Sequence, residues 1–217
     1  MSAEESRLRI TEIFFSLQGE SSLVGYPTVF VRLTGCPLRC GYCDTTYAFT
    51  GGEWYTLDAI LQKIKQYKTN YICVTGGEPL AQKSCAALLT LLCDEGYKVS
   101  LETSGAMDIS SVDSRVIRVM DIKTPGSGEE SRNRYENIDC LSAADEVKFV
   151  ICHRSDYQWS KSIVEQYNLN NKCSVLFSPV QGDISASELA EWILEDQLSV
   201  RFQIQLHKYL WSNQPGK

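Results

Sequence analysis

Three cysteines, Cys36, Cys40 and Cys43, stand directly after the apolar run Thr28–Leu33. Their spacing is Cys-x3-Cys-x2-Cys, and the next cysteine along the chain is Cys73. A fully ligated 4Fe–4S cluster takes four thiolates, so three thiolates would leave one iron with an open coordination position. An open position is typical of a catalytic metal site, whereas a structural site is closed. The pattern therefore indicates a catalytic cluster, with a zinc site or unrelated core cysteines as the alternatives.

Further polar motifs stand where apolar runs end. Thr75-Gly-Gly-Glu-Pro79 follows the run Tyr71–Val74, and adjacent glycines at such a point allow close backbone approach to a ligand. Glu78 in this motif can accept a hydrogen bond from an ammonium group. Three later runs end in the polar or small residues Glu102 and Ser104, Asp121 and Lys123, and Ser178, Pro179 and Val180. Active sites of barrel-like α/β folds assemble at the carboxyl ends of strands.

The elements that position these motifs follow from hydrophobic periodicity. Strands are predicted at Thr28–Leu33, Tyr71–Val74, Lys98–Glu102, Val116–Asp121, Glu146–Ile151, Cys173–Ser178 and Arg201–Gln205. Helices are predicted at Leu57–Tyr67, Gln82–Glu95, Tyr157–Tyr167 and Ser185–Asp196, with Thr56 and Ser185 as N-caps. The alternation indicates an α/β fold with a largely parallel sheet. A closed eight-unit barrel typically needs ~250 residues, so we expect an open, partial barrel of about six core parallel strands. Residues 1–217 are predicted to form a single domain.

Composition limits the classes of partner. The net charge is −6, from 21 basic and 27 acidic residues, which gives the chain no overall attraction for nucleic acid. No apolar stretch approaches the ~20 residues that span a bilayer, and the first residues lack a signal-peptide pattern. We therefore expect a cytoplasmic protein that binds neither nucleic acid nor membrane. Outside the triplet, Cys73, Cys85, Cys93, Cys152 and Cys173 lie in apolar patterns and are predicted to pack in the core.

The cysteine spacing together with the Thr75-Gly-Gly-Glu-Pro79 motif resembles the radical S-adenosylmethionine (SAM) superfamily. The resemblance implies a 4Fe–4S cluster on Cys36, Cys40 and Cys43, with SAM chelating the open iron and yielding a 5′-deoxyadenosyl radical on reduction. Tyr42 would pack on the cluster or on the SAM adenine. The SAM-binding residues implied are Tyr42, Gly76, Gly77, Glu78, Glu102, Ser104, Asp121, Lys123, Ser178, Pro179 and Val180.

Motifs at both ends narrow the resemblance to one family. Ser16-Leu-Gln-Gly-Glu20, the segment Gly35-Cys36 to Cys43-Asp-Thr45 and His207-Lys-Tyr-Leu-Trp211 together resemble the 7-carboxy-7-deazaguanine synthases, over about Ile10 to Trp211. This resemblance implies a lyase that contracts the ring of 6-carboxy-5,6,7,8-tetrahydropterin with loss of ammonia, in queuosine or deazapurine biosynthesis. It also implies a homodimer, a flavodoxin-type reductant and no catalytic residue beyond the cofactor ligands.

The same resemblance assigns substrate and magnesium contacts. Arg32 would neutralise the substrate carboxylate, for which the guanidinium fork is suited. Thr45 would ligate Mg²⁺, which prefers oxygen ligands. Gln18 supplies both a donor and an acceptor for the pterin amide edge, and Glu20 could accept from its exocyclic amine. The substrate-binding set implied is Leu17, Gln18, Gly19, Glu20, Arg32, Thr75 and His207.

Purely structural interpretations of these residues stay open at this point. Gln18 could cap a turn, Arg32 could form a buried structural ion pair, and Thr45 could cap the next segment. Two other functions compete: a glycyl-radical activase with the same cysteine spacing, and a non-catalytic iron–sulfur or zinc module. The second predicts four protein ligands and leaves the motifs at Thr75 and Glu102 unexplained.

Overall fold

A single sheet of nine strands runs through the computed structural model, which describes residues 7–212, 214 and 216. The strand order is β3-β1-β2-β4-β5-β6-β7-β8-β9. All neighbours from β2 to β9 pair in parallel, whereas β1 pairs antiparallel with both β2 and β3. The strands are β1 Arg7–Leu17, β2 Pro27–Leu33, β3 Glu53–Thr56, β4 Tyr71–Gly76, β5 Lys98–Thr103, β6 Ile117–Asp121, β7 Glu146–Ile151, β8 Ser174–Pro179 and β9 Arg201–Phe202.

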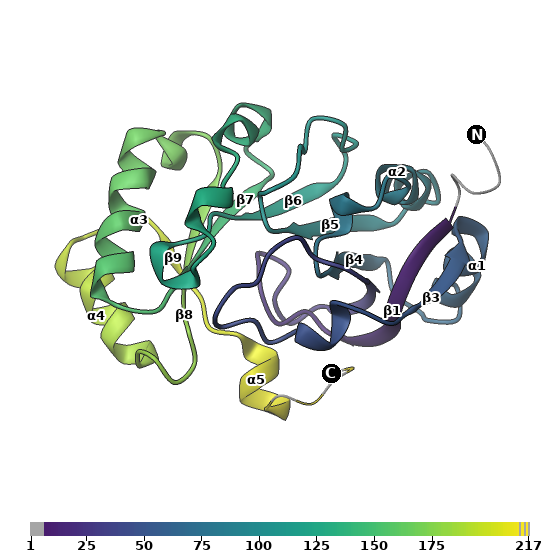
Figure 1. The fold of residues 1–217 in the computed structure, drawn as a ribbon, viewed down its shortest axis with the longest axis horizontal. Helices are drawn as coiled ribbons and strands as arrows, with labels where there is room; N and C mark the ends of the chain where they lie inside the picture. Colours follow the sequence, from purple (N-terminus) through teal and green to yellow (C-terminus); the bar gives the residue numbers. More distant parts are fainter. Residues whose placement is uncertain (1–6, 213, 215, 217) are drawn as a thin grey trace.

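Four α-helices lie in the connections between parallel strands and cover one face of the sheet, whereas the described β5–β6 and β6–β7 connections contain no α-helix. α1 (Leu57–Ile64) and α2 (Cys85–Asp94) lie towards the β1 end, while α3 (Arg154–Gln166) and α4 (Ala186–Glu195) lie side by side near β8 and β9 (Figure 1). A short last helix, α5 (Leu206–Trp211), stands apart from these four. Two predicted N-caps are confirmed, because Thr56 Oγ1 accepts from Ala59 N (3.2 Å) and Ser185 Oγ accepts from Glu188 N (3.1 Å).

The two faces of the sheet differ in chemistry. In each parallel strand alternate residues point to opposite faces, and the apolar set packs against the helices to form the core. That set includes Val31, Val74, Leu101, Phe149 and Phe177. Their neighbours Arg32, Thr75, Glu102 and Lys148 belong to the other face and line a cavity. The alternation therefore places a polar cavity on the inner side of the sheet and a dry core on the outer side.

The predicted α/β fold with an open, partial barrel is confirmed. Among the described strands, the two ends of the order are β3 and β9, which do not pair with each other, so the sheet does not close. Seven strands run parallel, the last of them only two residues long, close to the expected six. The single-domain assignment stays a prediction.

The sequence pattern missed three elements, β1, β3 and α5. β1 contains a register shift between Ile10 and Glu12, so its apolar residues do not keep one alternation along the strand. β3 is a four-residue edge strand with little buried surface, and α5 has only six residues. The predicted helix at Gln82–Glu95 is shorter in the structure, where α2 runs from Cys85 to Asp94. The residues Pro79–Ala81 before it form a separate 3₁₀ turn.

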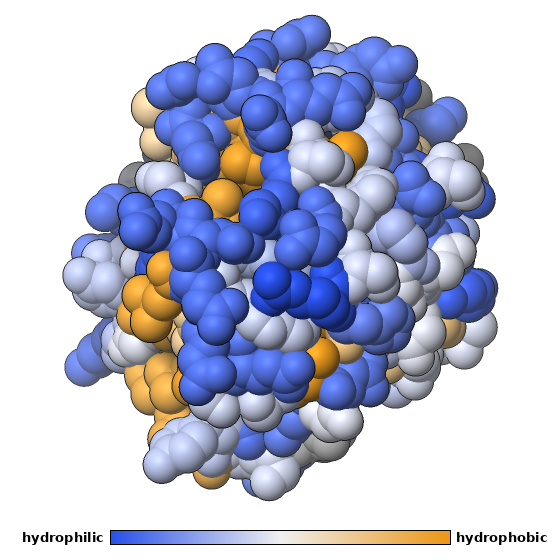
Figure 2. All heavy atoms as spheres, turned by 90° about the vertical axis from the view of Figure 1, so that its left-hand side faces the viewer, coloured by the Kyte–Doolittle hydropathy of each residue, from blue (hydrophilic) through white to orange (hydrophobic). Residues whose placement is uncertain are grey.

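The surface on the α3 and α4 side is mainly hydrophilic, and its apolar areas are small and separate (Figure 2). Within the described part of the chain, every helix is too short or too polar to cross a membrane.

Candidate active site

A cavity of about 680 Å³ opens at the carboxyl ends of the parallel strands. Most of the residues singled out from the sequence line it, although they come from separate segments. These are Leu17, Gln18, Gly19, Glu20, Arg32, Cys36, Cys40, Tyr42, Cys43, Thr45, Thr75, Gly76, Gly77, Glu102, Ser104, Asp121, Lys123, Val180 and His207. Glu78, Ser178 and Pro179 are not part of the lining.

The three cysteines lie in one loop between β2 and β3 that forms a wall of the cavity. The loop is held by its own backbone: Gly35 N donates to Ala48 O (2.8 Å), Cys43 N to Cys40 O (3.1 Å) and Gly41 N to Ser127 O (3.0 Å). The Arg39 side chain donates to the carbonyl oxygen of Cys36 (2.8 Å). All three thiols are free and partly accessible, so they are available as ligands on the cavity side.

The number and type of these donors fit a 4Fe–4S cluster with one open iron. Cys36, Cys40 and Cys43 are three free thiols that line the same cavity, and thiolates are the ligands of such clusters. A fully ligated cluster takes four thiolates, so three from this loop would leave one iron open to the cavity.

Gly76 and Gly77 bring the end of β4 into direct contact with the start of the cysteine loop. A Cβ on Gly77 would lie 2.2 Å from the Gly35 carbonyl oxygen, and one on Gly76 would lie 2.3 Å from that of Leu33. Gly76 also has φ +150°. Any side chain at either position would separate the two segments, so the glycine pair fixes the distance between β4 and the three thiols.

Glu78 has a different place from the one its motif predicted. Its side chain is fully buried and does not line the cavity. The carboxylate accepts from Leu80 N (2.9 Å), from Thr103 Oγ1 (3.0 Å) and from Ser104 through both N (2.7 Å) and Oγ. A carboxylate has about four acceptor positions, so this one is saturated by its own chain. Glu78 therefore ties the end of β4 to the end of β5 and leaves no free acceptor for a ligand ammonium.

Four charged side chains form a continuous chain along the cavity floor. Lys148 Nζ lies 2.7 Å from Glu20 Oε2 and 3.2 Å from Asp121 Oδ1, and Lys123 Nζ lies 2.6 Å from Asp121 Oδ2. The register places Asp121 directly opposite Lys148 on the paired strands β6 and β7. Burial alone would raise the pKa of Asp121, but the two lysines outweigh it and lower that pKa. The pKa of Glu20 is lowered in the same way, mainly by Lys148.

Glu102 is the exception among these carboxyls. Burial raises its pKa, and the neighbouring charges of Glu20 and Asp121 raise it further, while Lys148 only partly opposes them. Thr75 Oγ1 (3.3 Å) and Gln18 Nε2 (3.4 Å) donate to its two oxygens. The inner face thus holds one carboxyl that binds its proton more tightly than an ordinary glutamic acid.

The N-terminal and C-terminal motifs meet at the rim. Leu206 N donates to Gly19 O (3.0 Å), and a Cβ on Gly19 would lie 2.2 Å from His207 Nδ1. Gln205 Nε2 donates to Glu20 (2.8 Å). Burial lowers the pKa of His207, so its imidazole is neutral at pH 7. The contact brings together two motifs that lie nearly two hundred residues apart in the sequence.

Thr45 and Arg32 stand on the remaining wall. Thr45 Oγ1 donates to Asp44 Oδ1 (2.9 Å), and the other oxygen of Asp44 pairs with Lys208 Nζ on α5 (2.8 Å). Although partial burial would raise the pKa of Asp44, Lys208 lowers it to about 2. Arg32 pairs through Nε with Glu12 (2.6 Å), which is the ion pair that the structural interpretation of this residue predicted.

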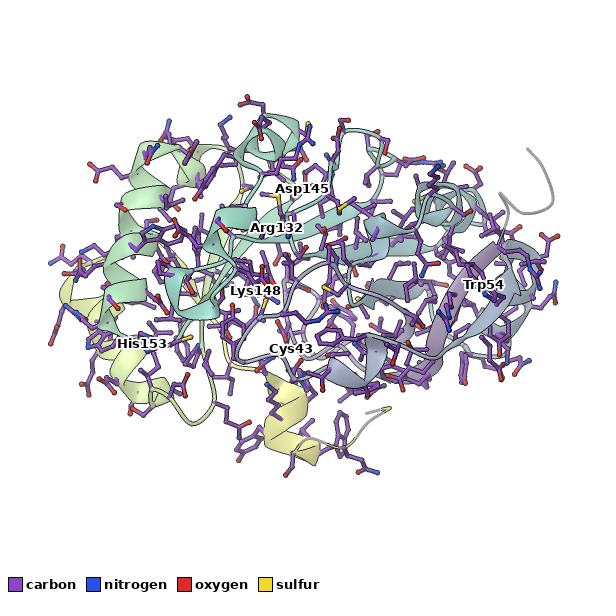
Figure 3. All side chains as sticks on the ribbon, in the orientation of Figure 1. Cys43, Trp54, Arg132, Asp145, Lys148 and His153 are labelled. Carbon is purple, nitrogen blue, oxygen red and sulfur yellow. The ribbon has the colours of Figure 1, made fainter. Side chains whose placement is uncertain are left out.

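Sequence reasoning missed several polar groups of the cavity, among them Lys148, Asp44 and Cys152. Lys148 lies inside a predicted strand, and a polar residue alternating with apolar ones there was the available signal (Figure 3). Cys152, which we expected in the core, is buried but lines the cavity, and burial raises the pKa of its thiol to about 12. The lysine and the cysteine come from the β7 strand and the turn after it.

The sequence matches the radical SAM superfamily over residues 30–191. It is 44% identical over 211 residues to the 7-carboxy-7-deazaguanine synthase of Chlorobaculum tepidum, covering 96% of each chain. It is 43% identical over 220 residues to the protein of the same name from Koribacter versatilis, covering 94% of this chain and 97% of that one.

Two solved structures share the fold. The crystal structure of QueE from Escherichia coli superposes with a TM-score of 0.76 at 20% identity, covering 95% of this chain and all of that one. Streptococcus suis SuiB, solved bound to S-adenosylmethionine, gives a TM-score of 0.55 at 15% identity over 79% of this chain and 45% of that one. These similarities concern the architecture of the sheet and its helices.

Proposed function

Because this chain belongs to the 7-carboxy-7-deazaguanine synthase family of the radical SAM superfamily, we propose that it converts 6-carboxy-5,6,7,8-tetrahydropterin to 7-carboxy-7-deazaguanine with loss of ammonia. The observation that carries the proposal is the similarity to synthases of that name along almost the entire chain. Such a product would serve queuosine or related deazapurine biosynthesis. The enzyme is a radical SAM lyase with a 4Fe–4S cluster and SAM as its cofactors.

Cys36, Cys40 and Cys43 would hold the cluster, and their free thiols on one cavity wall support this role. The cluster and SAM, when bound, would supply the radical chemistry needed to take hydrogen from the substrate carbon that bears the carboxylate. The chain has to enclose this chemistry and exclude water. The narrow approach of Gly77 to Gly35 allows the cosubstrate to lie against backbone close to the thiols.

SAM would lie between the cysteine loop and the ends of β4 to β8. Lys123 is a buried cation in the cavity lining and is suited to a carboxylate, and Ser104 also lines the cavity while its hydroxyl donates to Glu78. Tyr42 has a buried hydroxyl without a partner in the described chain, and its ring is available for packing. Since Glu78 is saturated, we propose that the ammonium group meets the backbone of Gly76 and Gly77. Asp121 and Val180 would complete the SAM contacts, whereas Ser178 and Pro179 would act only from behind the lining.

The pterin would occupy the opposite half of the cavity. Gln18 offers an amide to its amide edge, while Glu20 carries a charge balanced by Lys148 and can accept from an amine. Arg32 would face the substrate carboxylate, and the neutral imidazole of His207 would close the rim above Gly19. Leu17 and Thr75 would flank these groups. Substrate and SAM would then lie towards opposite ends of the Glu20–Lys148–Asp121–Lys123 chain.

Magnesium is a further part of the proposal. Thr45 would supply its hydroxyl oxygen, and the neighbouring Asp44 carboxylate supports an oxygen-rich site at that wall. Mg²⁺ keeps several waters and takes few protein ligands, so one hydroxyl plus substrate oxygens is a sufficient set. Turnover should then require added Mg²⁺, and Thr45→Val should raise the Mg²⁺ concentration needed for half-maximal rate.

Turnover of the carboxytetrahydropterin tests the activity directly. Anaerobically reconstituted protein with SAM, dithionite and Mg²⁺ should consume the substrate and release one deazapurine and one ammonia per turnover. Consumption of SAM without loss of pterin would instead favour an activase that acts on a protein partner. Absence of SAM binding, with four cysteine ligands found by spectroscopy, would favour a non-catalytic iron–sulfur module.

The cluster assignment has its own test. Cys40→Ala should abolish the visible absorbance of the reconstituted cluster and the reductive cleavage of SAM, because one corner of the cluster loses its ligand. The thiol is not part of the apolar core, so the far-ultraviolet circular dichroism should not change. Cys93→Ala is the matched control on α2. SAM cleavage by the Cys40 variant would contradict the assignment.

We also propose a homodimer, a flavodoxin-type reductant and a cytoplasmic location. Two exposed aromatic side chains, Phe15 on β1 and Tyr26 in the turn before β2, are candidates for a subunit contact. The exposed Arg39 marks the point where an acidic reductant could approach the cysteine loop. Nine unpaired cysteines are consistent with a compartment that keeps thiols reduced. Sedimentation of the purified protein and reduction by flavodoxin in place of dithionite test the first two.

A further inference from the structure

Arg32 is held from behind by a carboxylate that the strand pairing brings to it. Along β1 and β2, Ile10 lies opposite Leu33, but the next pair is Glu12 opposite Arg32. Thr11 is therefore an extra residue on β1, which is the geometry of a β-bulge. A bulge redirects the side chains that follow it and is frequent beside active sites. Without it, Thr11 would stand opposite Arg32 in place of Glu12.

The contacts around the guanidinium leave it little freedom. Arg32 Nε donates to Glu12 Oε1 (2.6 Å), and the Tyr47 hydroxyl donates to the same oxygen (2.8 Å). The rings of Phe14 and Tyr47 lie 5.6 and 5.8 Å from Arg32 Cζ. The side chains of Arg32 and Glu12 are only 15% and 21% exposed. Such a charge-assisted hydrogen bond between partly buried groups is stronger than a surface ion pair.

The two sides of Arg32 have different functions. Glu12 does not line the cavity, whereas Arg32, Phe14 and Tyr47 do. The ion pair uses Nε only, and within the described chain neither Nη nitrogen of Arg32 has a hydrogen-bond partner. These two nitrogens form a planar pair of donors that matches the two oxygens of a carboxylate. The ion pair is thus compatible with a second, bidentate partner from the cavity.

A competing partner stands inside the cavity. Glu102 acts on Arg32 through space, and a released guanidinium would be drawn to it. Pairing with Glu102 would consume the donors that face the ligand. Glu12 prevents this by holding Nε on the opposite side of Arg32.

We propose that Glu12 and Tyr47 are positioning residues that orient Arg32 to bind the carboxylate of the substrate. The inference rests on the proposed function, because it takes a carboxylated pterin as the ligand. In this proposal Glu12 determines the selectivity for that carboxylate and takes no part in binding SAM or the cluster. Tyr47 completes the arrangement by fixing the carboxylate of Glu12.

Binding of two ligands separates this role from a merely structural one. Dissociation constants are measured anaerobically, with cluster and SAM present, for 6-carboxytetrahydropterin and for the tetrahydropterin that lacks the carboxylate. Glu12→Ala should weaken binding of the carboxylated ligand about 10- to 100-fold, the loss expected for one hydrogen bond to a charged group. Binding of the analogue should not change. In turnover the same variant should raise KM and leave kcat nearly constant, the signature of lost uniform binding.

Milder variants should lose less affinity for the carboxylated ligand. Glu12→Gln keeps an oxygen acceptor for Nε and should lose less affinity than Glu12→Ala. Tyr47→Phe should lose about 2- to 10-fold, because it removes one donor to Glu12 but leaves the bond between Arg32 and Glu12 in place. Glu53→Ala is the matched control, because Glu53 also accepts from a tyrosine hydroxyl, that of Tyr55 at 2.8 Å, on the neighbouring strand β3. It should bind both ligands like the wild type.

Arg32→Met separates failure of this inference from failure of the proposed function. If Arg32→Met leaves the preference for the carboxylated ligand intact, the proposed role of Arg32 is wrong. If it removes the preference while Glu12→Ala and Tyr47→Phe do not, only the positioning role is wrong. Glu12→Ala should cause no further loss when added to Arg32→Met, and an additional loss of the same size would overturn the inference. Should Glu12→Ala not fold, Glu12→Gln and Tyr47→Phe decide the question alone.

Discussion

At the scale of single residues, Lys148 makes the buried charges of the cavity possible. It lies within 2.7 Å of Glu20 and 3.2 Å of Asp121, and its own side chain is 10% exposed. Two carboxylates this close to each other would repel strongly at low dielectric. The lysine offsets that repulsion, and its pKa is raised well above the ordinary value because the neighbouring carboxylates outweigh the opposite effect of burial.

Lys148→Met should therefore be strongly destabilising. Removing one partner of a buried ion pair leaves uncompensated charge and costs about 3–5 kcal/mol. Urea unfolding of the cluster-free protein at neutral pH measures the difference. Lys172→Met is the control, since Lys172 pairs with the exposed Asp139 at 3.2 Å and should lose less than about 1 kcal/mol. Equal losses in the two variants would contradict the role given to Lys148.

The raised pKa of Glu102 predicts that part of the stability is lost as pH rises. Its pKa is raised by burial and by Glu20 and Asp121, so the folded protein holds this proton more tightly than the unfolded one. Stability is then lost as pH rises above the unfolded value of 4.5 towards the higher folded pKa. The neutral amide introduced by Glu102→Gln has no such proton to lose, so this variant should gain on the wild type as pH rises through this window.

Unfolding of both proteins between about pH 5 and pH 8 checks this. Glu95→Gln is the comparison on the surface, where Glu95 pairs with Lys65 and the substitution should give no such gain. A gap between Glu102→Gln and the wild type that stays constant or narrows with pH would mean that Glu102 is ionised as easily as an exposed glutamate.

At the scale of elements, α5 docks on the turn that follows β1 through a contact that only glycine permits. A Cβ on Gly19 would lie 2.2 Å from His207 Nδ1 and 3.1 Å from His207 N. Lys208 on the same helix pairs with Asp44 beside Thr45, so α5 also touches the cysteine loop. The helix thereby joins the segment proposed for the pterin to the segment proposed for magnesium.

Gly19→Ala should move α5 away from the cavity. Overpacking of this kind costs about 1–3 kcal/mol, and we expect lost pterin turnover with retained SAM cleavage in the absence of substrate. His207→Ala removes the nearest atoms, so Gly19→Ala should cost less stability in that background. A cost that is the same in both backgrounds would show that the imidazole is not the obstacle.

At the scale of the whole molecule, stability should be highest in the middle of the sheet. β4 to β7 are paired on both sides and carry fully buried residues such as Val74, Leu101 and Phe149. β3 and β9 lie at the edges with little buried surface. Amide exchange tracks such local differences in stability.

Hydrogen–deuterium exchange read by mass spectrometry should therefore show β4–β7 exchanging slowest, and β3, β9 and α5 fastest. Binding of SAM and pterin should slow α5 and the cysteine loop while leaving β4–β7 almost unchanged. Protection of α5 equal to that of β5 in the ligand-free protein would contradict this picture.

The sequence by itself determined the family, the α/β class and most of the parallel strands. The three cysteines are close together in the chain, and hydrophobic alternation is a local property, so both can be recognised without coordinates. The pair Gly76 and Gly77 was recognised as a point of close approach to a ligand, but the structure shows that it packs against the backbone of Leu33 and Gly35.

Only the tertiary structure decided which partners the charged groups pair with. Glu78 accepts hydrogen bonds from Thr103 and Ser104. Lys148 pairs with two carboxylates, and a bulge brings Glu12 opposite Arg32. Each of these pairings joins segments that are distant in the chain. Where the partners stand on paired strands, as Asp121 and Lys148 or Glu12 and Arg32 do, a shift of one residue in register would replace them. Strand register and the burial of charge are set by the packing of the whole sheet, which no local sequence pattern encodes.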